Sequence, residues 1–452
     1  MEKCILSKIA VLLMVLGLAS CTTSAKIMPE RSMSGNYNTS LWQGSTNTIW
    51  NKLQQTPPSR LAELQKNTTD PTQLAWLQLA LISKQKNLGT SQLANELIQW
   101  CAQHPTHPAN KLLPYPDTLS SWATHPAPRQ IALLLPQGGA FALSGQAIRE
   151  GFLNAYYNNS ARGNQRIKFY DTSGTKNLPA LYAQALKDGA DFVVGPLVKD
   201  NVQQLQNSNA ITAPTLALNY TNGPSHINLY QFGLLPEDEA AQIVTQARNA
   251  GQSKAIVIAP QNAWGHRLVA SFSSHWQASG GKIQDVWYYT SQATFNQEIA
   301  QMLRVNQAAQ NANNKEALAN QRRQDFDVIF LFAQPQEARV IVPLLRYYYV
   351  NNVPIYATSS VYASRPDPSK DVDLNGVMVC DIPWSATAND GIAASDRLYA
   401  MGQDAYRLSQ SLQRLIILTT FPLYGSTGAL TLSSSHQIHR RLPCITVHNG
   451  YL

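Results

Sequence analysis

The chain has 452 residues, of which 44% are hydrophobic and 14% are charged. This length is sufficient for two or three domains with substantial cores. The formal net charge is +8, but the lysines and arginines are scattered, and no run of them has the density of a nucleic-acid-binding patch. We therefore expect no nucleic-acid partner.

The first 20 residues have the layout of a signal peptide. Lys3 and Lys8 precede an apolar run over 9–18, which is too short to remain as a membrane-spanning helix. The following LASC, which ends at Cys21, resembles the lipobox of bacterial lipoproteins. We expect lipidation of Cys21, although an ordinary signal peptide cleaved nearby is the alternative. Because Thr22 rather than Asp follows, the expected location is the outer membrane, on its periplasmic side.

Five cysteines are present. Cys4 leaves with the signal peptide and Cys21 carries the lipid on this interpretation. In an oxidising compartment Cys380 and Cys444 could form a disulfide, which leaves Cys101 over, but the sequence does not decide the connectivity. Nothing has the spacing of a metal site, and we expect neither a metal nor a cofactor.

The first part of the mature chain, residues 21–128, divides into three segments. Residues 21–45 are rich in Ser, Thr, Asn and Gly and predict a flexible tether. Within 46–104, apolar residues recur every three or four positions between 70 and 101, which predicts a helical hairpin of the tetratricopeptide kind. Such a short segment should either lean on the larger domain or be only modestly stable. Residues 105–128 contain many prolines and predict a linker.

From residue 129 onward, short apolar runs alternate with amphipathic stretches. The expected strands are 131–136, 167–171, 191–197, 214–219, 227–233, 254–260, 282–289, 327–332, 354–358 and 376–384. The expected helices are 144–158, 178–187, 199–207, 237–250, 264–278, 295–324 and 340–349. This alternation predicts two doubly wound α/β lobes with a cleft at the carboxyl ends of their parallel strands. The tail over 426–450 predicts a β-hairpin.

Several of these stretches carry a family resemblance. IALLLPQGGAFALSGQAIREGFLNA, DFVVGPLVKDNVQQL and the segment from QFGLLPEDEAAQ to GGKI resemble type I periplasmic binding proteins. The lipobox, WCAQHPTHPANKLLP, DIPW, RLYAMGQDAYRL and YGSTGALTLSSSHQIHRRLP are more specific, and the chain over its whole length resembles the LppC/LpoA family.

That resemblance implies a fold and a role. The fold is an α/β, two-lobed type I periplasmic-binding-protein-like domain over 129–452, preceded by a short all-α tetratricopeptide-like segment. Family members are outer-membrane lipoproteins that reach through the peptidoglycan, bind a class A penicillin-binding protein and stimulate peptide cross-linking. The helical segment here, about 80 residues, is shorter than in the best-known members, which puts the reach and any contact made by that segment in doubt.

If the cleft holds a ligand, the loops after the strands should supply its contacts through backbone N–H groups and hydroxyls. The candidates are Gly138, Gly139, Ser144, Pro196, Leu197, Asn219, Tyr220, Trp264, Gly265 and Ser359. The alternative, rated about equal to binding of a small cell-wall fragment, is that the loops are inherited from a binding protein and that the cleft no longer binds a ligand. These loops lack Asp and Glu, which argues against an amino-acid ligand, since amino-acid receptors usually hold the ammonium group with a carboxylate.

No catalytic residue is predicted. Ser144 begins a helix, but no GxSxG surrounds it and no partner can be assigned to it. Two functions other than synthase activation remain open. One is a lipid-anchored periplasmic solute receptor for amino acids, peptides or cell-wall fragments, and the other is a structural envelope lipoprotein. The extra helical segment favours the activator over the receptor.

Overall fold

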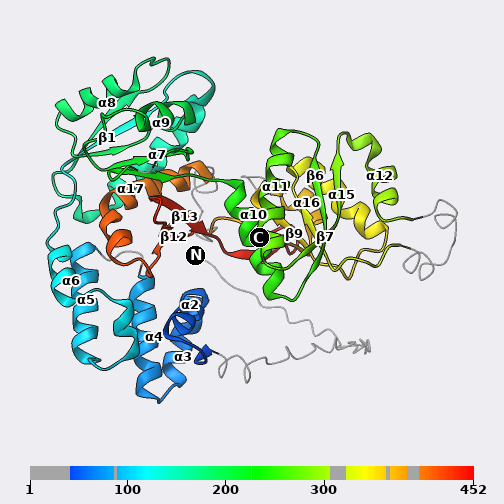
Figure 1. Ribbon diagram of the computed structural model, residues 1–452, viewed down its shortest axis with the longest axis horizontal. Coiled ribbons are helices and arrows are strands. Elements are labelled where there is room, and N and C mark those ends of the chain that lie inside the picture. Colours follow the sequence, from blue (N-terminus) through cyan, green and yellow to red (C-terminus); the bar gives the residue numbers. More distant parts are fainter. Residues whose placement is uncertain (1–40, 86–88, 225, 306–321, 363–366, 384–396) are drawn as a thin grey trace, which may run out of the picture. The chain divides into compact units, whose positions relative to one another are not determined.

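A computed structural model describes residues 41–85, 89–224, 226–305, 322–362, 367–383 and 397–452 (Figure 1). The signal peptide and Cys21 lie outside these residues. The chain divides into two compact units, 1–55 and 56–452. The described part of the first unit contains helix α2 (Thr46–Gln55), and Lys52 Nζ donates a hydrogen bond to the Gln43 carbonyl at 3.0 Å.

The second unit begins with helices α3 (Pro58–Asn67), α4 (Pro71–Lys84) and α5 (Thr90–Gln103). Asp70 caps α4, because its carboxylate accepts the Gln73 N–H at 2.8 Å. Leu77 and Leu97 are completely buried on the inner faces of α4 and α5. The hairpin expected between 70 and 101 is therefore present.

The structure differs from the linker expected over 105–128. A 3-10 helix (Pro108–Leu112) and helix α6 (Pro116–Ala123) lie within it, and Leu119 and Trp122 of α6 are buried. Both helices begin with a proline at their first position, where the missing N–H costs nothing. The prolines here start new helices instead of only ending old ones, so much of this segment belongs to the helical part.

The first lobe is built on an eight-stranded sheet in the order β11-β12-β13-β5-β4-β3-β1-β2. Strands β11 (Leu423–Tyr424), β12 (Ala429–Leu432) and β13 (Gln437–Arg441) come from the C-terminal part of the chain. The parallel strands of the lobe are β1 (Gln130–Leu135), β2 (Arg166–Asp171), β3 (Phe192–Val194), β4 (Thr215–Ala217) and β5 (Leu229–Phe232). Its helices are α7 (Ala142–Asn158), α8 (Leu178–Lys187), α9 (Lys199–Gln206) and α17 (Arg397–Ile417). Helix α17 packs along α7 so closely that a Cβ on Gly151 would lie 1.9 Å from the Tyr399 carbonyl oxygen, and a Cβ on Gly402 would lie 2.0 Å from the Ile148 carbonyl oxygen.

The second lobe is built on a six-stranded sheet in the order β14-β10-β9-β8-β6-β7. Its parallel strands are β6 (Lys254–Pro260), β7 (Lys282–Tyr289), β8 (Val328–Leu331), β9 (Ile355–Thr358) and β10 (Val377–Cys380). Its helices include α10 (Pro236–Asn249), α11 (Ala263–Ala278), α12 (Phe295–Met302) and α15 (Pro335–Tyr347). The alternation expected from the sequence is thus present in both lobes.

The helix expected over 295–324 is wrong in its length. Helix α12 ends at Met302, and Arg304 has a φ of 57°, which a continuing helix does not allow. Residues 306–321 lie outside the described part. At 322–325 the chain is an irregular segment, in which the buried Arg323 guanidinium pairs with Asp285 and Asp325.

The chain passes between the lobes three times: from β5 to α10, from β10 to α17, and from β13 (Gln437–Arg441) to β14 (Cys444–Thr446). The expected C-terminal hairpin forms in part, because β12 (Ala429–Leu432) and β13 pair antiparallel. However, β13 also pairs in parallel with β5, whereas β14 pairs antiparallel with β10 in the other sheet. The tail therefore completes both sheets.

Candidate functional site

The loop after β1 carries three of the candidate residues. The Gly138 N–H donates to Ser173 Oγ at 3.0 Å, whereas Gly139 is exposed with a φ of 72°. Ser144 lies in the first turn of α7 and, among the described residues, its hydroxyl has no hydrogen-bond partner. Nothing in this part of the structure activates Ser144 as a nucleophile.

The loops after β3 and β4 meet each other. Pro196 follows a cis peptide bond and is buried together with Leu197. Asn219 Nδ2 donates to the Leu197 carbonyl at 3.1 Å, and its Oδ1 accepts the Tyr220 N–H. The Tyr220 hydroxyl donates to the Ile438 carbonyl of β13, and burial raises the pKa of Tyr220. Asn219 and Tyr220 therefore connect strands and offer few groups to a ligand.

Trp264 and Gly265 lie in the first turn of α11, after β6. Gly265 is needed for packing, since a Cβ there would lie 2.1 Å from the Pro260 carbonyl oxygen. Gly145 of α7 meets the Pro136 carbonyl in the same way, at 2.2 Å. Each lobe thus places a glycine where the helix that follows its first strand approaches the end of that strand. The role of Gly265 in this contact is structural.

Ser359, after β9, lies beside a buried ion pair. Its N–H donates to Glu239 Oε2 at 2.9 Å. Glu239 Oε1 lies 3.5 Å from Arg440 Nη2, and both side chains are buried. Burial raises the pKa of Glu239, whereas Arg440 acts in the opposite direction. The candidate loops themselves carry no Asp or Glu, but Glu239 of α10 places a carboxylate beside one of them. This carboxylate accepts a hydrogen bond from within the protein.

A second ion pair lies at the crossing from β10 to α17. Arg397 Nε donates to Asp381 Oδ1 at 2.8 Å, and Arg397 Nη2 also reaches the Ser359 carbonyl at 3.0 Å. The Asp381 side chain is only 3% exposed. Sequence reasoning quoted both residues within larger motifs but assigned neither a role. Asp381 follows strand β10 and Arg397 begins helix α17, 16 positions later. Only the folded structure shows that the two side chains form an ion pair.

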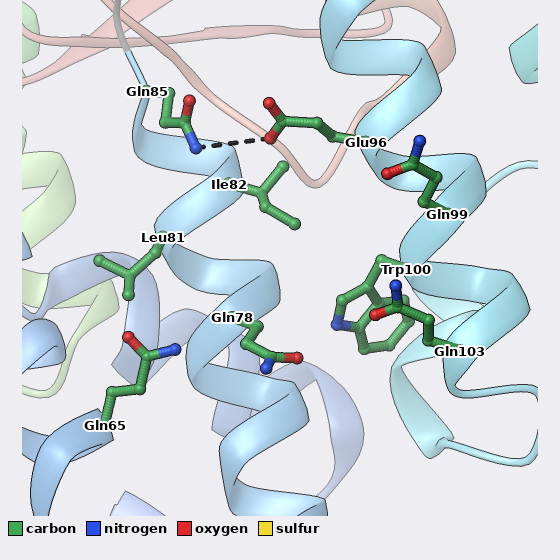
Figure 2. Close-up of a pocket in the computed structure, with 9 residues that line it drawn as sticks. All are labelled: Gln65, Gln78, Leu81, Ile82, Gln85, Glu96, Gln99, Trp100 and Gln103. Carbon is green, nitrogen blue, oxygen red and sulfur yellow. Dashed lines mark hydrogen bonds between the residues drawn. The ribbon is translucent and has the colours of Figure 1, made fainter.

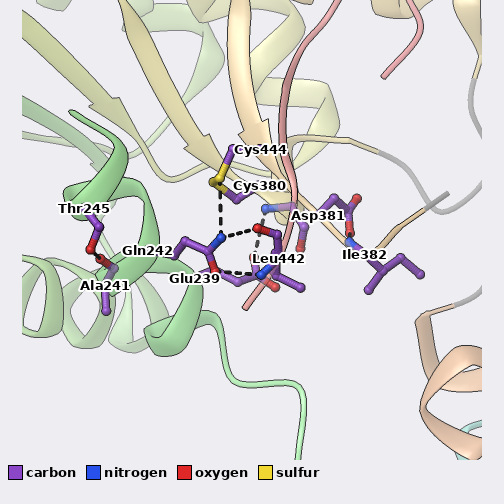
Figure 3. Close-up of a disulfide and its surroundings, with 10 residues drawn as sticks. Glu239, Ala241, Gln242, Thr245, Cys380, Asp381, Ile382, Leu442 and Cys444 are labelled. Carbon is purple, nitrogen blue, oxygen red and sulfur yellow. Dashed lines mark hydrogen bonds between the residues drawn. A yellow bond between two sulfur atoms is a disulfide. The ribbon is translucent and has the colours of Figure 1, made fainter. Parts of the chain in front are cut away.

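The third crossing is held by Gln242 and a disulfide (Figure 3). The Leu442 N–H donates to Gln242 Oε1 at 2.8 Å, and Gln242 Nε2 donates to the Leu442 carbonyl. Next to them a disulfide joins Cys380 of β10 to Cys444 of β14. Cys101 is a free, half-buried thiol, and burial raises its pKa.

Several of the candidate residues make contacts within the protein. Gly138, Asn219, Tyr220, Gly265 and Ser359 are engaged in contacts that join strands, helices or lobes. Among the described residues no group of His, Cys, Asp and Glu could hold a metal ion. In that same part of the chain, no helix is long and apolar enough to cross a membrane. The contacts of these candidate residues join strands, helices and lobes.

A groove lies in the helical part, where α3, α4 and α5 meet (Figure 2). Its volume is about 280 Å³. The lining residues are Gln65, Gln78, Leu81, Ile82, Gln85, Glu96, Gln99, Trp100 and Gln103. Sequence analysis did not identify this groove, although the spacing of 96, 99 and 103 places these residues on one face of α5.

Comparisons with known proteins give the family. The family model described as "LppC putative lipoprotein" matches residues 24–450. The chain belongs to the LppC family. Over 96% of its length it is 27% identical to a protein from Photobacterium profundum named penicillin-binding protein activator LpoA, of which it covers 74%.

Solved structures of LppC relatives have a similar fold. The chain is similar to LpoA from Haemophilus influenzae, with 26% identity and a TM-score of 0.63 over 90% of this chain and 72% of that one. It is also similar to the C-domain of LpoA from the same organism, described as a regulator of PBP1A, with 27% identity and a TM-score of 0.59 over 71% of this chain and 98% of that one.

The LppC chain is also similar to a branched-chain amino acid ABC transporter structure from Chromobacterium violaceum, with 25% identity and a TM-score of 0.55 over 70% of this chain and 99% of that one. The α/β domain after residue 129 is thus a two-lobed periplasmic-binding-protein-like domain preceded by helices, as expected.

Proposed function

We propose that this chain is an outer-membrane lipoprotein that binds and activates a class A penicillin-binding protein and so stimulates peptidoglycan cross-linking. The observation that carries the proposal is the family match over 24–450, which includes both the helical part and the two lobes. Relatives of this chain are named penicillin-binding protein activators, and the C-domain of one of them is described as a regulator of PBP1A.

The mode of action is binding without catalysis. The polar groups at the strand ends are largely used in contacts within the protein, and Ser144 has no described partner that would activate it. An activator of this kind shifts its partner toward an active arrangement, so it must bind that arrangement more tightly than the inactive one. A tenfold change in activity needs a difference in binding free energy of about 1.4 kcal/mol.

The test is a reconstitution with the class A synthase of the same organism. We expect the full mature chain to co-precipitate with the synthase and to raise the cross-linked fraction of the product several-fold. A synthase with its transpeptidase serine replaced serves as the control, because it should bind the activator without forming cross-links. Absence of binding, or unchanged cross-linking despite binding, would refute the proposal.

The membrane address rests on Cys21. We propose that this residue carries the lipid and that the protein is located at the outer membrane, because Thr22 and not an inner-membrane-retaining Asp follows the cysteine. Two or more acyl chains give stable anchoring where one does not. In cells fed labelled palmitate, we expect label in the wild-type protein and none in Cys21→Ala, with Cys4→Ala as the matched control. Equal labelling of Cys21→Ala would contradict this assignment.

The receptor alternative keeps support from the similarity to the transporter-associated structure. It predicts that amino acids, peptides or muropeptides raise the Tm of the purified protein. The internal use of Asn219, Tyr220 and Ser359 makes the activator the better supported function.

A further inference from the structure

Three asparagines of this chain, Asn222, Asn375 and Asn449, are each followed by glycine. In such a dipeptide the glycine nitrogen can attack Cγ of the asparagine, because no Cβ shields it. Ammonia leaves, and water opens the resulting succinimide to aspartate or isoaspartate. The reaction requires a free glycine N–H and a main chain that can turn toward the side chain. The fold treats the three dipeptides differently.

A single hydrogen bond protects two of these dipeptides. The Gly450 N–H donates to Asn375 Oδ1 at 3.0 Å. This bond occupies the nitrogen that would attack Asn449, and it also fixes the side-chain amide of Asn375. The Gly376 N–H, which would attack Asn375, donates to the Val447 carbonyl at 2.9 Å. Both dipeptides must therefore open locally before they can react.

The dipeptide at 222–223 lacks this protection. It lies between β4 and β5, where Asn222, Gly223 and Pro224 are exposed. Within the described part of the chain, neither the Asn222 side chain nor the Gly223 N–H makes a hydrogen bond. Attack of the Gly223 nitrogen on Asn222 Cγ therefore needs no preceding loss of a hydrogen bond.

The residues on both sides of this dipeptide are held in place. The Thr221 N–H donates to Gln231 Oε1 at 3.1 Å, and the Thr221 hydroxyl donates to Gln206 Oε1 at 2.6 Å. Gln206 Nε2 donates to the Pro224 carbonyl at 2.8 Å. An isoaspartate carries the main chain through its side chain, so it adds a methylene between Thr221 and Pro224. An aspartate leaves the length of the main chain unchanged.

We propose that Asn222 is a site of spontaneous deamidation in the folded protein and that its isoaspartyl product loosens the loop after β4. The reaction needs no enzyme and no cofactor, since the side-chain nitrogen leaves as ammonia and water supplies the oxygen. The same loop carries Tyr220, whose hydroxyl donates to the Ile438 carbonyl of β13, so the change acts next to a contact between strands. The proposal is independent of synthase activation, because it rests on the chemistry of this loop alone.

The experiment follows the full mature chain during incubation at mildly alkaline pH, with peptide mapping by mass spectrometry. Replacement of the side-chain NH2 by OH shifts the mass of the affected peptide, and the aspartyl and isoaspartyl forms elute separately. We expect Asn222 to react at least about tenfold faster than Asn375 and Asn449, since each of these must first lose a hydrogen bond. In urea with reductant, where no fold distinguishes the three asparagines, their rates should converge.

Two outcomes would overturn the assignment of the site. One is reaction of Asn375 or Asn449 in the folded protein at the rate of Asn222. The other is the same order of rates in urea as in the folded protein, which would trace the difference to neighbouring residues in the sequence and not to the fold.

The variants Asn222→Gln and Asn222→Asp test the effect on the loop. Incubated wild type should show several-fold faster hydrogen exchange over 215–232 than fresh wild type. Incubated Asn222→Gln should show no such increase, because the longer side chain does not form the five-membered ring. Fresh Asn222→Asp adds the charge without the methylene and should match fresh wild type. Exchange that is unchanged by incubation, or equally raised in fresh Asn222→Asp, would refute the loosening of the loop by isoaspartate.

Discussion

Buried charges show how single residues adapt to this fold. Lys84, at the end of α4, is 9% exposed, and its Nζ lies 4.8 Å from the centroid of the Tyr424 ring. Burial, together with the nearby Arg441, lowers the pKa of Lys84 to about 8. A lysine in water titrates near 10.4. The folded protein therefore holds this ammonium group at a cost in stability.

The cost predicts a pH dependence. Below about pH 8 Lys84 is charged in both states, whereas between about pH 8 and 10.5 only the unfolded chain keeps its proton. Stability from this group therefore rises with pH across that window. We expect the advantage of Lys84→Met over wild type in unfolding free energy to shrink by about 1–2 kcal/mol from pH 7 to 10, after allowance for solvent screening. Urea unfolding at both pH values measures it.

Lys66→Met is the matched control, because Lys66 is an exposed lysine on α3. Its difference from wild type should not change with pH. A constant difference between Lys84→Met and wild type would show that Lys84 keeps an ordinary pKa.

At the scale of elements, α17 joins the helical part to the first lobe. Arg414 of α17 is 4% exposed and donates from Nη2 to the Ser83 carbonyl at 3.0 Å and to the Pro422 carbonyl at 3.2 Å. The Thr90 hydroxyl donates to the Gln410 carbonyl of the same helix. The short helical segment therefore leans on the larger domain, the first of the two outcomes expected for a segment with so few hairpins.

Breaking this contact should loosen α4 and α5. Arg414→Met leaves the two carbonyl groups without their donor, which costs about 1–3 kcal/mol for a buried acceptor. We expect faster hydrogen exchange in 71–103 with little change in 254–289. Arg414→Lys restores a charged donor, so its rate of hydrogen exchange in 71–103 should lie between those of wild type and Arg414→Met. The exposed Lys199→Met should match wild type. Unchanged exchange in Arg414→Met would show that apolar packing alone holds the helices.

At the scale of the whole chain, the three crossings between the lobes are tied to one another. The ion pairs Glu239–Arg440 and Asp381–Arg397 both contact Ser359, and the Cys380–Cys444 disulfide joins the segments of two crossings. Buried pairs of this kind cost desolvation but specify one arrangement of the groups that they join. The lobes are therefore connected by hydrogen bonds and ion pairs in addition to the three segments of chain that cross between them.

Removing the disulfide tests one part of that network. The cysteines are 64 positions apart, and a loop of that length contributes about 2–4 kcal/mol when closed. We expect the Cys380→Ser, Cys444→Ser double variant to have a lower Tm than wild type, and reductant to lower the Tm of wild type alone. Cys101→Ser controls for loss of a thiol. A Tm of the double variant equal to that of wild type would show that the crossings are held without the covalent bond.

The sequence by itself determined the local elements and the family. Alternation of strands and helices placed β6, β7 and α8 at their observed limits, because buried parallel strands and amphipathic helices carry their own periodicity. The motifs placed the whole chain in the LppC family. The hairpin between 70 and 101 was predicted equally well, because its apolar residues recur every three or four positions.

Only the tertiary structure decided which distant residues meet. The tail forms a hairpin locally, yet β13 and β14 enter different sheets. Gln437 of β13 pairs with Gln231, 206 positions away, and Cys444 of β14 pairs with Cys380, 64 positions away. The partners of Glu239 and Asp381, and the groove of glutamines, likewise depend on how helices and strands pack. Side-chain periodicity records which face of an element is buried, but not what lies against it.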